Sequence, residues 1–99
     1  MPIQYLHQPH YGFVGGVHSL KPQFEMRGSN IYATNFNQIM QKNMPVYEVR
    51  GSQIFSTIHH LDGPSSHPLY TIKGQNIHTT IHNSNHDAVL PAFELKSHL

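Results

Sequence analysis

The stretch PVYEVRGSQIFSTIHHLDGPSSH, residues 45–67, returns in the same pattern as PLYTIKGQNIHTTIHNSNHDAVL, residues 68–90. The pattern also fits PQFEMRGSNIYATNFNQIMQKNM at 22–44 and a shortened copy, PAFELKSHL, at 91–99. Each copy begins with a proline, and successive copies are 23 residues apart without insertion or deletion. A fixed period of this length is the signature of a repeat architecture. The sequence therefore predicts a β-repeat domain over 22–99, preceded by an N-terminal cap or arm at 1–21.

Each repeat has the pattern of two short strands separated by a break. In residues 47–50, apolar and charged side chains alternate, which puts them on opposite faces of a strand. The dipeptide at 51–52, Gly-Ser, supplies a bend, bulge or tight turn, and a second run rich in β-branched and aromatic residues follows. The rest of each repeat is polar and turn-like. No segment shows a helix of three turns, so we expect an all-β fold.

Two architectures fit this repeat. In a β-solenoid each repeat is one rung, stacked about 4.8 Å from the next. In an antiparallel hairpin meander each repeat is one hairpin. The absence of insertions favours the solenoid, because a meander tolerates longer loops. In both, the apolar positions that recur in phase are expected to form the core: Phe24, Met26, Ile31, Tyr47, Val49, Ile54, Ile58, Tyr70, Ile72, Ile77, Ile81, Phe93 and Leu95.

The composition excludes several classes of protein. Charged residues make up 11% of the 99 residues, against about 25% in an ordinary domain, whereas histidine occurs ten times. The net charge is +1, and no block of like charge indicates binding to nucleic acid. No apolar run is long enough for a transmembrane helix, and the N-terminus lacks the pattern of a signal peptide. Without cysteine there is no disulfide or thiolate site, and the localisation stays unknown.

The last repeat stops soon after its first strand. An unpaired strand edge is a template on which another chain can add. We therefore expect a non-enzymatic structural protein that self-assembles into homo-oligomers or filaments through this edge. The residues of the expected assembly edge are Pro91, Ala92, Phe93, Glu94, Leu95 and Lys96.

Four histidines lie in the second strand of two successive repeats or just after it, and they form an alternative candidate site. His59 and His82 occupy the same repeat position, so neighbouring repeats would bring them together. Imidazoles that converge in this way bind Zn²⁺, Ni²⁺ or Cu²⁺, although no cofactor is required by the fold. The aromatic residues Tyr32 and Phe55 share the position of His78, which favours a structural role instead. The alternative function is a module that binds a transition metal or small ligand through His59, His60, His78 and His82.

The run His59-His60-Leu61-Asp62-Gly63 resembles the HHxDG stretch of HNH-type endonucleases. The resemblance covers five residues and implies a metal-dependent nuclease, in which one histidine activates water and a neighbour helps to hold the metal. The Asn-rich segment and helix that follow in that family are replaced here by Pro-Ser-Ser-His at 64–67. Since the repeat itself accounts for the histidine pair, we expect the protein not to be an enzyme.

The histidines also predict a response to pH. His59, His78 and His82 are expected on the exposed face of the second strand, where protonation would place like charges on neighbouring repeats. A histidine crowded by like charge has a lowered pKa, and its protonation opposes the packed state. Moving from pH 7 to about pH 5 is therefore expected to loosen the assembly.

Overall fold

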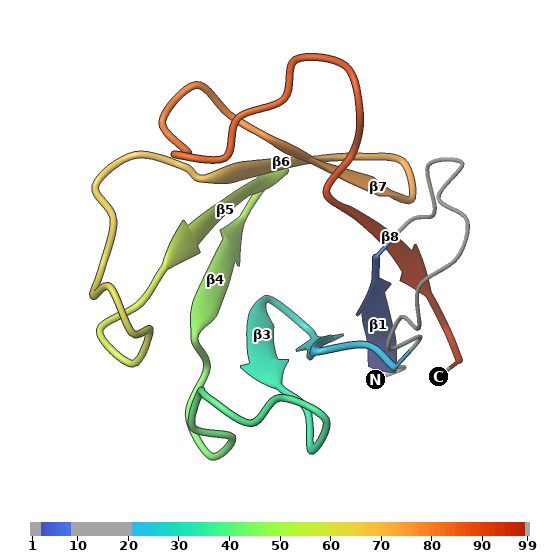
Figure 1. The fold of residues 1–99 in the computed structure, drawn as a ribbon, viewed down its shortest axis with the longest axis vertical. Coiled ribbons are helices and arrows are strands. Elements are labelled where there is room, and N and C mark those ends of the chain that lie inside the picture. Colours follow the sequence, from blue (N-terminus) through green and yellow to red (C-terminus); the bar gives the residue numbers. More distant parts are fainter. Residues whose placement is uncertain (1–2, 9–20, 99) are drawn as a thin grey trace.

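The computed structural model describes residues 3–8 and 21–98. Within these residues every element is a β-strand, which confirms the prediction of an all-β fold. The strands run in sequence order around a closed antiparallel barrel (Figure 1). They are β1 (Ile3–His7), β2 (Phe24–Arg27), β3 (Asn30–Ala33), β4 (Tyr47–Arg50), β5 (Gln53–Ser56), β6 (Tyr70–Lys73), β7 (Asn76–Thr79) and β8 (Phe93–Lys96).

Each complete repeat folds as an antiparallel hairpin, so the meander is the architecture found and the favoured β-solenoid is wrong. The physical reason is the turn inside the repeat. Gly28, Gly51 and Gly74 have φ angles of 64°, 64° and 63°. A glycine with positive φ at the first position of a two-residue loop is typical of a type II′ turn, which returns the chain antiparallel to itself. The turn sets Arg50 opposite Gln53 instead of carrying the chain onward around a rung.

The fourth repeat is completed by the beginning of the chain. In the β1–β8 pair Leu6 lies opposite Leu95, just as Ile31 lies opposite Met26 in the first repeat. Strand β1 therefore takes the place of the missing second strand, while residues 9–20 of the expected cap or arm lie outside the described residues. The expectation of an open edge is wrong, because β8 pairs with β7 on one side and with β1 on the other. This correction applies to Pro91, Ala92, Phe93, Glu94, Leu95 and Lys96.

A ring of four aromatic side chains lies inside the barrel. Neighbouring ring centroids are 5.5 Å (Phe24–Tyr47), 5.8 Å (Tyr47–Tyr70), 5.8 Å (Tyr70–Phe93) and 6.1 Å (Phe93–Phe24) apart. Three of these contacts are edge-to-face, the arrangement that the aromatic quadrupole favours. The isoleucines that share one repeat position are almost completely buried, and Leu6 supplies the fourth member of their set: Ile31, Ile54, Ile77 and Leu6.

Two expected core residues are instead exposed. Ile58 and Ile81 have 73% and 79% of their surface accessible. The reason is that β5 and β7 end two residues earlier than expected, and a threonine turn follows each strand. The hydroxyl of Thr57 donates to the carbonyl of Pro45 at 2.6 Å, and Thr80 makes the same bond to Pro68 at 2.5 Å. Ile58 and Ile81, which follow these threonines, therefore lie outside the sheet. The other expected core positions are confirmed as buried or packed against the core.

The outer wall of the barrel carries charges that are paired along single strands. Arg27 contacts Glu25 at 3.2 Å, and Arg50 contacts Glu48 at 2.8 Å. The guanidinium of Arg50 also lies over the ring of Phe55, 4.4 Å from its centroid. These contacts satisfy the charges locally, so the wall of the first two repeats is polar and electrostatically balanced.

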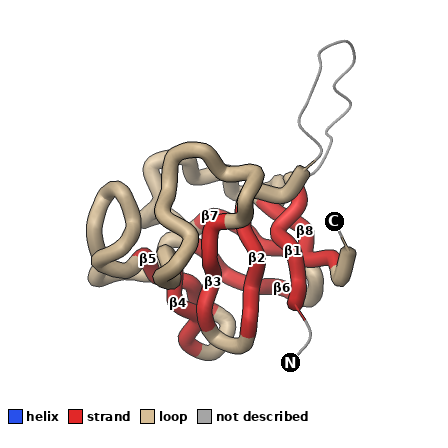
Figure 2. Tube along the Cα trace, turned by 90° about the horizontal axis from the view of Figure 1, so that it is seen from below, coloured by secondary structure: helices blue, strands red, loops and turns tan. Residues whose placement is uncertain are grey.

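The two ends of the barrel differ. Two-residue turns close the hairpins at one end, whereas the long loops 34–46, 57–69 and 80–92 connect the repeats at the other (Figure 2). Seen along the barrel, these loops spread outward around its rim (Figure 1). In the described part of the chain no helix could span a membrane.

Candidate functional site

The end of the barrel with the long loops carries the exposed apolar side chains. Among the described residues, each large apolar side chain found exposed belongs to one of the three long loops. The sequence predicts polar turns over most of these stretches, because single apolar residues among Asn, Ser and Gly follow no strand or helix period, whereas it predicts Ile58 and Ile81 as core residues. We call the set the apolar loop end: Phe36, Ile39, Met44, Ile58, Leu61, Ile81, Val89 and Leu90.

The loops that present these side chains are held by internal hydrogen bonds. The Oδ1 atom of Asn37 accepts from the backbone N–H groups of Ile39 and Met40, both at 3.0 Å. The Oδ1 atom of Asp87 accepts in the same way from Val89 and Leu90, both at 2.9 Å. These bonds to Leu90 and Val89 lower the pKa of the Asp87 carboxyl. The apolar side chains therefore stand on loops of defined shape.

His60 reaches from the second long loop to the aromatic ring of the core. Its Nε2 atom lies 3.0 Å from the hydroxyl oxygen of Tyr47, and the two rings pack edge-to-face with centroids 4.9 Å apart. Its Nδ1 atom accepts a hydrogen bond from the backbone N–H of Asp62 at 3.0 Å. This acceptor role places the proton on Nε2, so the imidazole donates to the Tyr47 hydroxyl.

Burial shifts the pKa values of both partners. The His60 side chain is 8% exposed, and loss of water around the charged ring lowers its pKa. The Asp62 carboxylate, 3.9 Å from Nδ1, opposes this shift without reversing it. Burial likewise raises the pKa of Tyr47, helped by its neighbour Tyr70. The contact therefore joins a neutral imidazole to a neutral phenol.

The four expected metal ligands take different partners. His59 lies 3.4 Å from the side-chain amide of Gln41, and His82 stacks on His67 with centroids 4.3 Å apart. His60 is turned toward Tyr47, and His78 stands on β7 opposite Thr71. In residues 3–8 and 21–98, no group of three or more His, Asp or Glu side chains comes close enough together to hold a metal ion. In the HHxDG run, His60 is nearly buried and turned toward Tyr47, whereas the Asp62 carboxylate, 3.9 Å from His60 Nδ1, is 92% exposed.

A pocket of about 280 Å³ lies between the second and third long loops. Tyr47 and His60 belong to its lining, which also includes Leu69 and His82. The remaining lining residues are small or polar: Ser56, Asp62, Gly63, Pro64, Ser65, Asn83, Ser84 and Asn85. No sequence pattern predicts this pocket, because its two walls come from different repeats and the HHxDG run of the second loop has no counterpart in the third.

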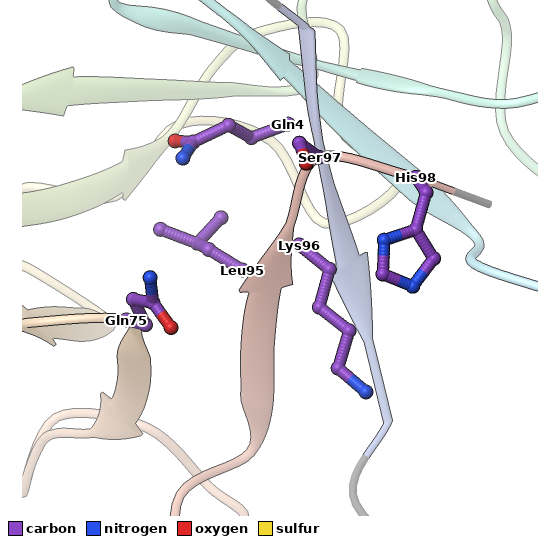
Figure 3. A pocket seen from close by; sticks show the side chains of 6 residues that line it. All are labelled: Gln4, Gln75, Leu95, Lys96, Ser97 and His98. Atoms are coloured by element: carbon purple, nitrogen blue, oxygen red, sulfur yellow. The ribbon is translucent and has the colours of Figure 1, made fainter.

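A second pocket, of about 420 Å³, lies at the opposite end of the barrel and is lined by Gln4, Gln75, Leu95, Lys96, Ser97 and His98. Gln4 and Leu95 extend to one side of β1 and β8, whereas Lys96 and His98 lie on the other (Figure 3). Because these side chains do not point to a common centre, they do not form a convergent binding site.

Comparison with known proteins gives no relative: no family model, no curated protein and no solved structure matches the chain.

Proposed function

We propose that this protein is a non-enzymatic β-repeat protein that self-associates through the apolar loop end. The observation that carries the proposal is that the exposed large apolar residues of the described chain all lie in the three long loops. Large apolar patches on a soluble surface mark interaction sites, because their burial releases ordered water. The partner that we propose is a second copy of the same chain.

The outer wall of the barrel is less suited than the apolar loop end to bind a second copy. A closed barrel has no free strand edge, so another chain cannot add to the sheet. On the wall, Arg27 and Arg50 already pair with glutamates of their own strands. Association therefore uses the loops, and it leaves the sheet intact.

A second copy matches the apolar loop end in apolar character and complements it in charge. Ile58 and Ile81 occupy the same position in successive repeats, so the second and third long loops each present an exposed isoleucine side chain at this end of the barrel. The first long loop carries Lys42, whereas the next two carry Asp62 and Asp87. A two-fold axis at this end lets the first loop of one copy face an acidic loop of the other. Such an isologous contact closes on itself, which favours discrete oligomers over filaments.

Light scattering coupled to size exclusion tests this proposal. The wild type is expected to show a mass above 11.3 kDa that grows with concentration, whereas the double variant Ile58→Ser/Ile81→Ser should stay near 11.3 kDa. Lys73→Ser, an exposed change on the wall, serves as the control and should associate like the wild type. A wild-type protein that stays monomeric at high concentration, or a double variant that associates normally, would rule out the loop end as the interface.

A further inference from the structure

The pocket between the second and third long loops includes a position at which two repeats differ. Met40 of the first long loop packs against the core, and Gly63 occupies the same repeat position one period later. A Cβ atom at Gly63 would meet nothing within 4 Å, so no neighbouring side chain fills the space that the glycine leaves. The second loop is instead fastened at its edges, where the Ser56 hydroxyl donates to the Gly63 carbonyl at 2.8 Å. The result is a preformed hollow with hydrogen-bonded walls.

The polar groups of the lining divide into two kinds. Those near the base already bond within the protein: Tyr47 with His60, and Asn83 with the Leu69 carbonyl at 3.1 Å. Those at the rim point to solvent, since Asp62 is 92% exposed, and Ser84 and Asn85 are exposed as well. In the described part of the chain, neither Ser84 nor Asn85 makes a side-chain hydrogen bond.

The charges of the lining restrict the class of ligand. None of the lining residues is Lys or Arg, and Asp62 contributes a carboxylate, which disfavours phosphates and other anions. A single carboxylate that is almost fully exposed also holds a cation only weakly. By contrast, a carboxylate, an amide and a hydroxyl together accept and donate the hydrogen bonds of adjacent hydroxyl groups. The ring of His82 and the pyrrolidine of Pro64 supply apolar surface beside them.

We propose that this pocket binds a neutral polyhydroxylated ligand, namely a mono- or disaccharide unit. Asp62 accepts hydrogen bonds from two adjacent hydroxyl groups of the sugar, and the Asn85 amide donates to a third oxygen. Tyr47 and His60 form part of the rigid base, so the rim groups bind the ligand without rearrangement of the core. This proposal does not rest on the proposed self-association, but both use the second long loop, because Asp62 lines the pocket and also belongs to an acidic loop that would face a second copy.

The proposal is tested by following backbone and side-chain amide signals by NMR during addition of sugars. The probes are methyl β-D-glucopyranoside, methyl α-D-mannopyranoside and N-acetyl-D-glucosamine, up to about 50 mM, because one small open pocket gives millimolar affinity. We expect saturable shifts at Gly63, Ser84 and Asn85 with at least one probe. In Asp62→Asn and Asn85→Ala the affinity should fall about tenfold or more. Glu48→Gln removes a carboxylate from the outer wall and should leave binding unchanged.

Three results would overturn the proposal. One is the absence of saturable shifts with all three sugars, and another is equal affinity in the wild type and in Asp62→Asn. The third is that butylamine or inorganic phosphate shifts the same signals while the sugars do not, which would assign the pocket to an ion. The titration is repeated with Ile58→Ser/Ile81→Ser, in which sugar binding should persist. Failure of the sugar site is thereby distinguished from failure of the proposed self-association.

Discussion

The imidazole of His60 donates its Nε2 proton to the hydroxyl oxygen of Tyr47, 3.0 Å away. This bond ties the second long loop directly to the aromatic ring of the core. In the first and third repeats the same position holds Asn37 and Asn83, whose side-chain oxygens accept from backbone groups of their own loops. The second loop is thus fastened to the barrel interior in a way that the other two described loops are not.

Removing the hydroxyl of Tyr47 should destabilise the fold. Tyr47→Phe keeps the aromatic ring, as Phe24 and Phe93 show at the same repeat position, but leaves the buried His60 N–H without its acceptor. We expect the free energy of unfolding to fall by about 1–3 kcal/mol, measured by urea denaturation. Tyr32→Phe, on the outer wall, is the matched control and should change it little. Equal stability of the two variants would show that the His60 bond contributes nothing.

Stability should decrease as the pH falls below the ordinary histidine range. Burial lowers the pKa of His60 in the folded protein relative to its model value of 6.5, so the unfolded chain binds this proton first. The unfolded state is therefore favoured progressively as the pH drops through 6.5 toward the lower folded-state pKa, and above 6.5 the effect vanishes. Denaturation curves at about pH 7.5, 6 and 5 measure this slope.

The variant His60→Asn should lose that part of the pH dependence, because asparagine does not titrate and occurs naturally at this position in repeats one and three. His59→Asn is the neighbouring control and should keep the slope. If both variants follow the wild-type curve, the pH response belongs to another group. The expected loosening of the assembly through His59, His78 and His82 stays a separate prediction, whereas this slope in the stability of the fold rests on the contact of His60 with Tyr47.

Closure of the barrel should depend on Leu6. Its side chain is 3% exposed and packs in the core at the seam between the first and last strands. Leu6→Ala should lower the free energy of unfolding by about 2–5 kcal/mol, because it leaves a cavity in a packed core. Gln8→Ala, at an exposed position just after β1, should leave stability nearly unchanged. Thermal unfolding followed by circular dichroism compares the two, and a small loss in Leu6→Ala would mean that β1 adds little to the barrel.

The hairpin turns should be sensitive to loss of glycine. Gly51 has a φ of +64° and open space where a Cβ would stand, so substitution costs only backbone strain. We expect Gly51→Ala to lower the free energy of unfolding by about 1–2 kcal/mol. Ser52→Ala changes the next residue of the same turn and should be nearly neutral. A neutral Gly51→Ala would indicate that the turn relaxes to another type.

The histidines at the paired repeat positions should contribute nothing to transition-metal binding. His59 and His82 contact Gln41 and His67 respectively, so they do not converge on one ion. Calorimetric titration with ZnCl₂, NiCl₂ or CuCl₂ is expected to give the same affinity for the wild type and for His59→Ala/His82→Ala. A marked loss of metal affinity in the double variant would instead support the alternative function, a module that binds a transition metal through these histidines.

The sequence was sufficient to predict the repeat, the all-β class and most of the core, because these depend on local alternation and on a fixed period. Ile31, Ile54 and Ile77 recur in phase and are buried in phase. The choice of architecture depended on the turn, and a Gly-Ser dipeptide is compatible with both a bend and a reversal. The positive φ of Gly51 identifies the turn as a reversal, and the repeat pattern of the sequence does not reveal this angle.

The seam and the pocket were beyond sequence reasoning for a different reason. Leu6 and Leu95 are neighbours only because the barrel closes, and the short β1 segment lacks the proline and glycine that mark the other repeats. The pocket is lined by Gly63, which stands where an earlier repeat has Met40, and by residues of the following repeat, so it forms only between two folded loops. Long-range contacts of this kind leave no local pattern.

The pairing of β1 with β8 has a consequence for how the chain is made. A ribosome synthesises β1 first and β8 last, yet each is the other's neighbour in the finished sheet. Until β8 has emerged, the nascent chain holds an incomplete sheet whose terminal strands lack partners, and the contact that closes it spans nearly the whole length of the polypeptide. The final step of folding is therefore expected after translation of the last strand, and that interval is when the protein is most exposed to misassembly.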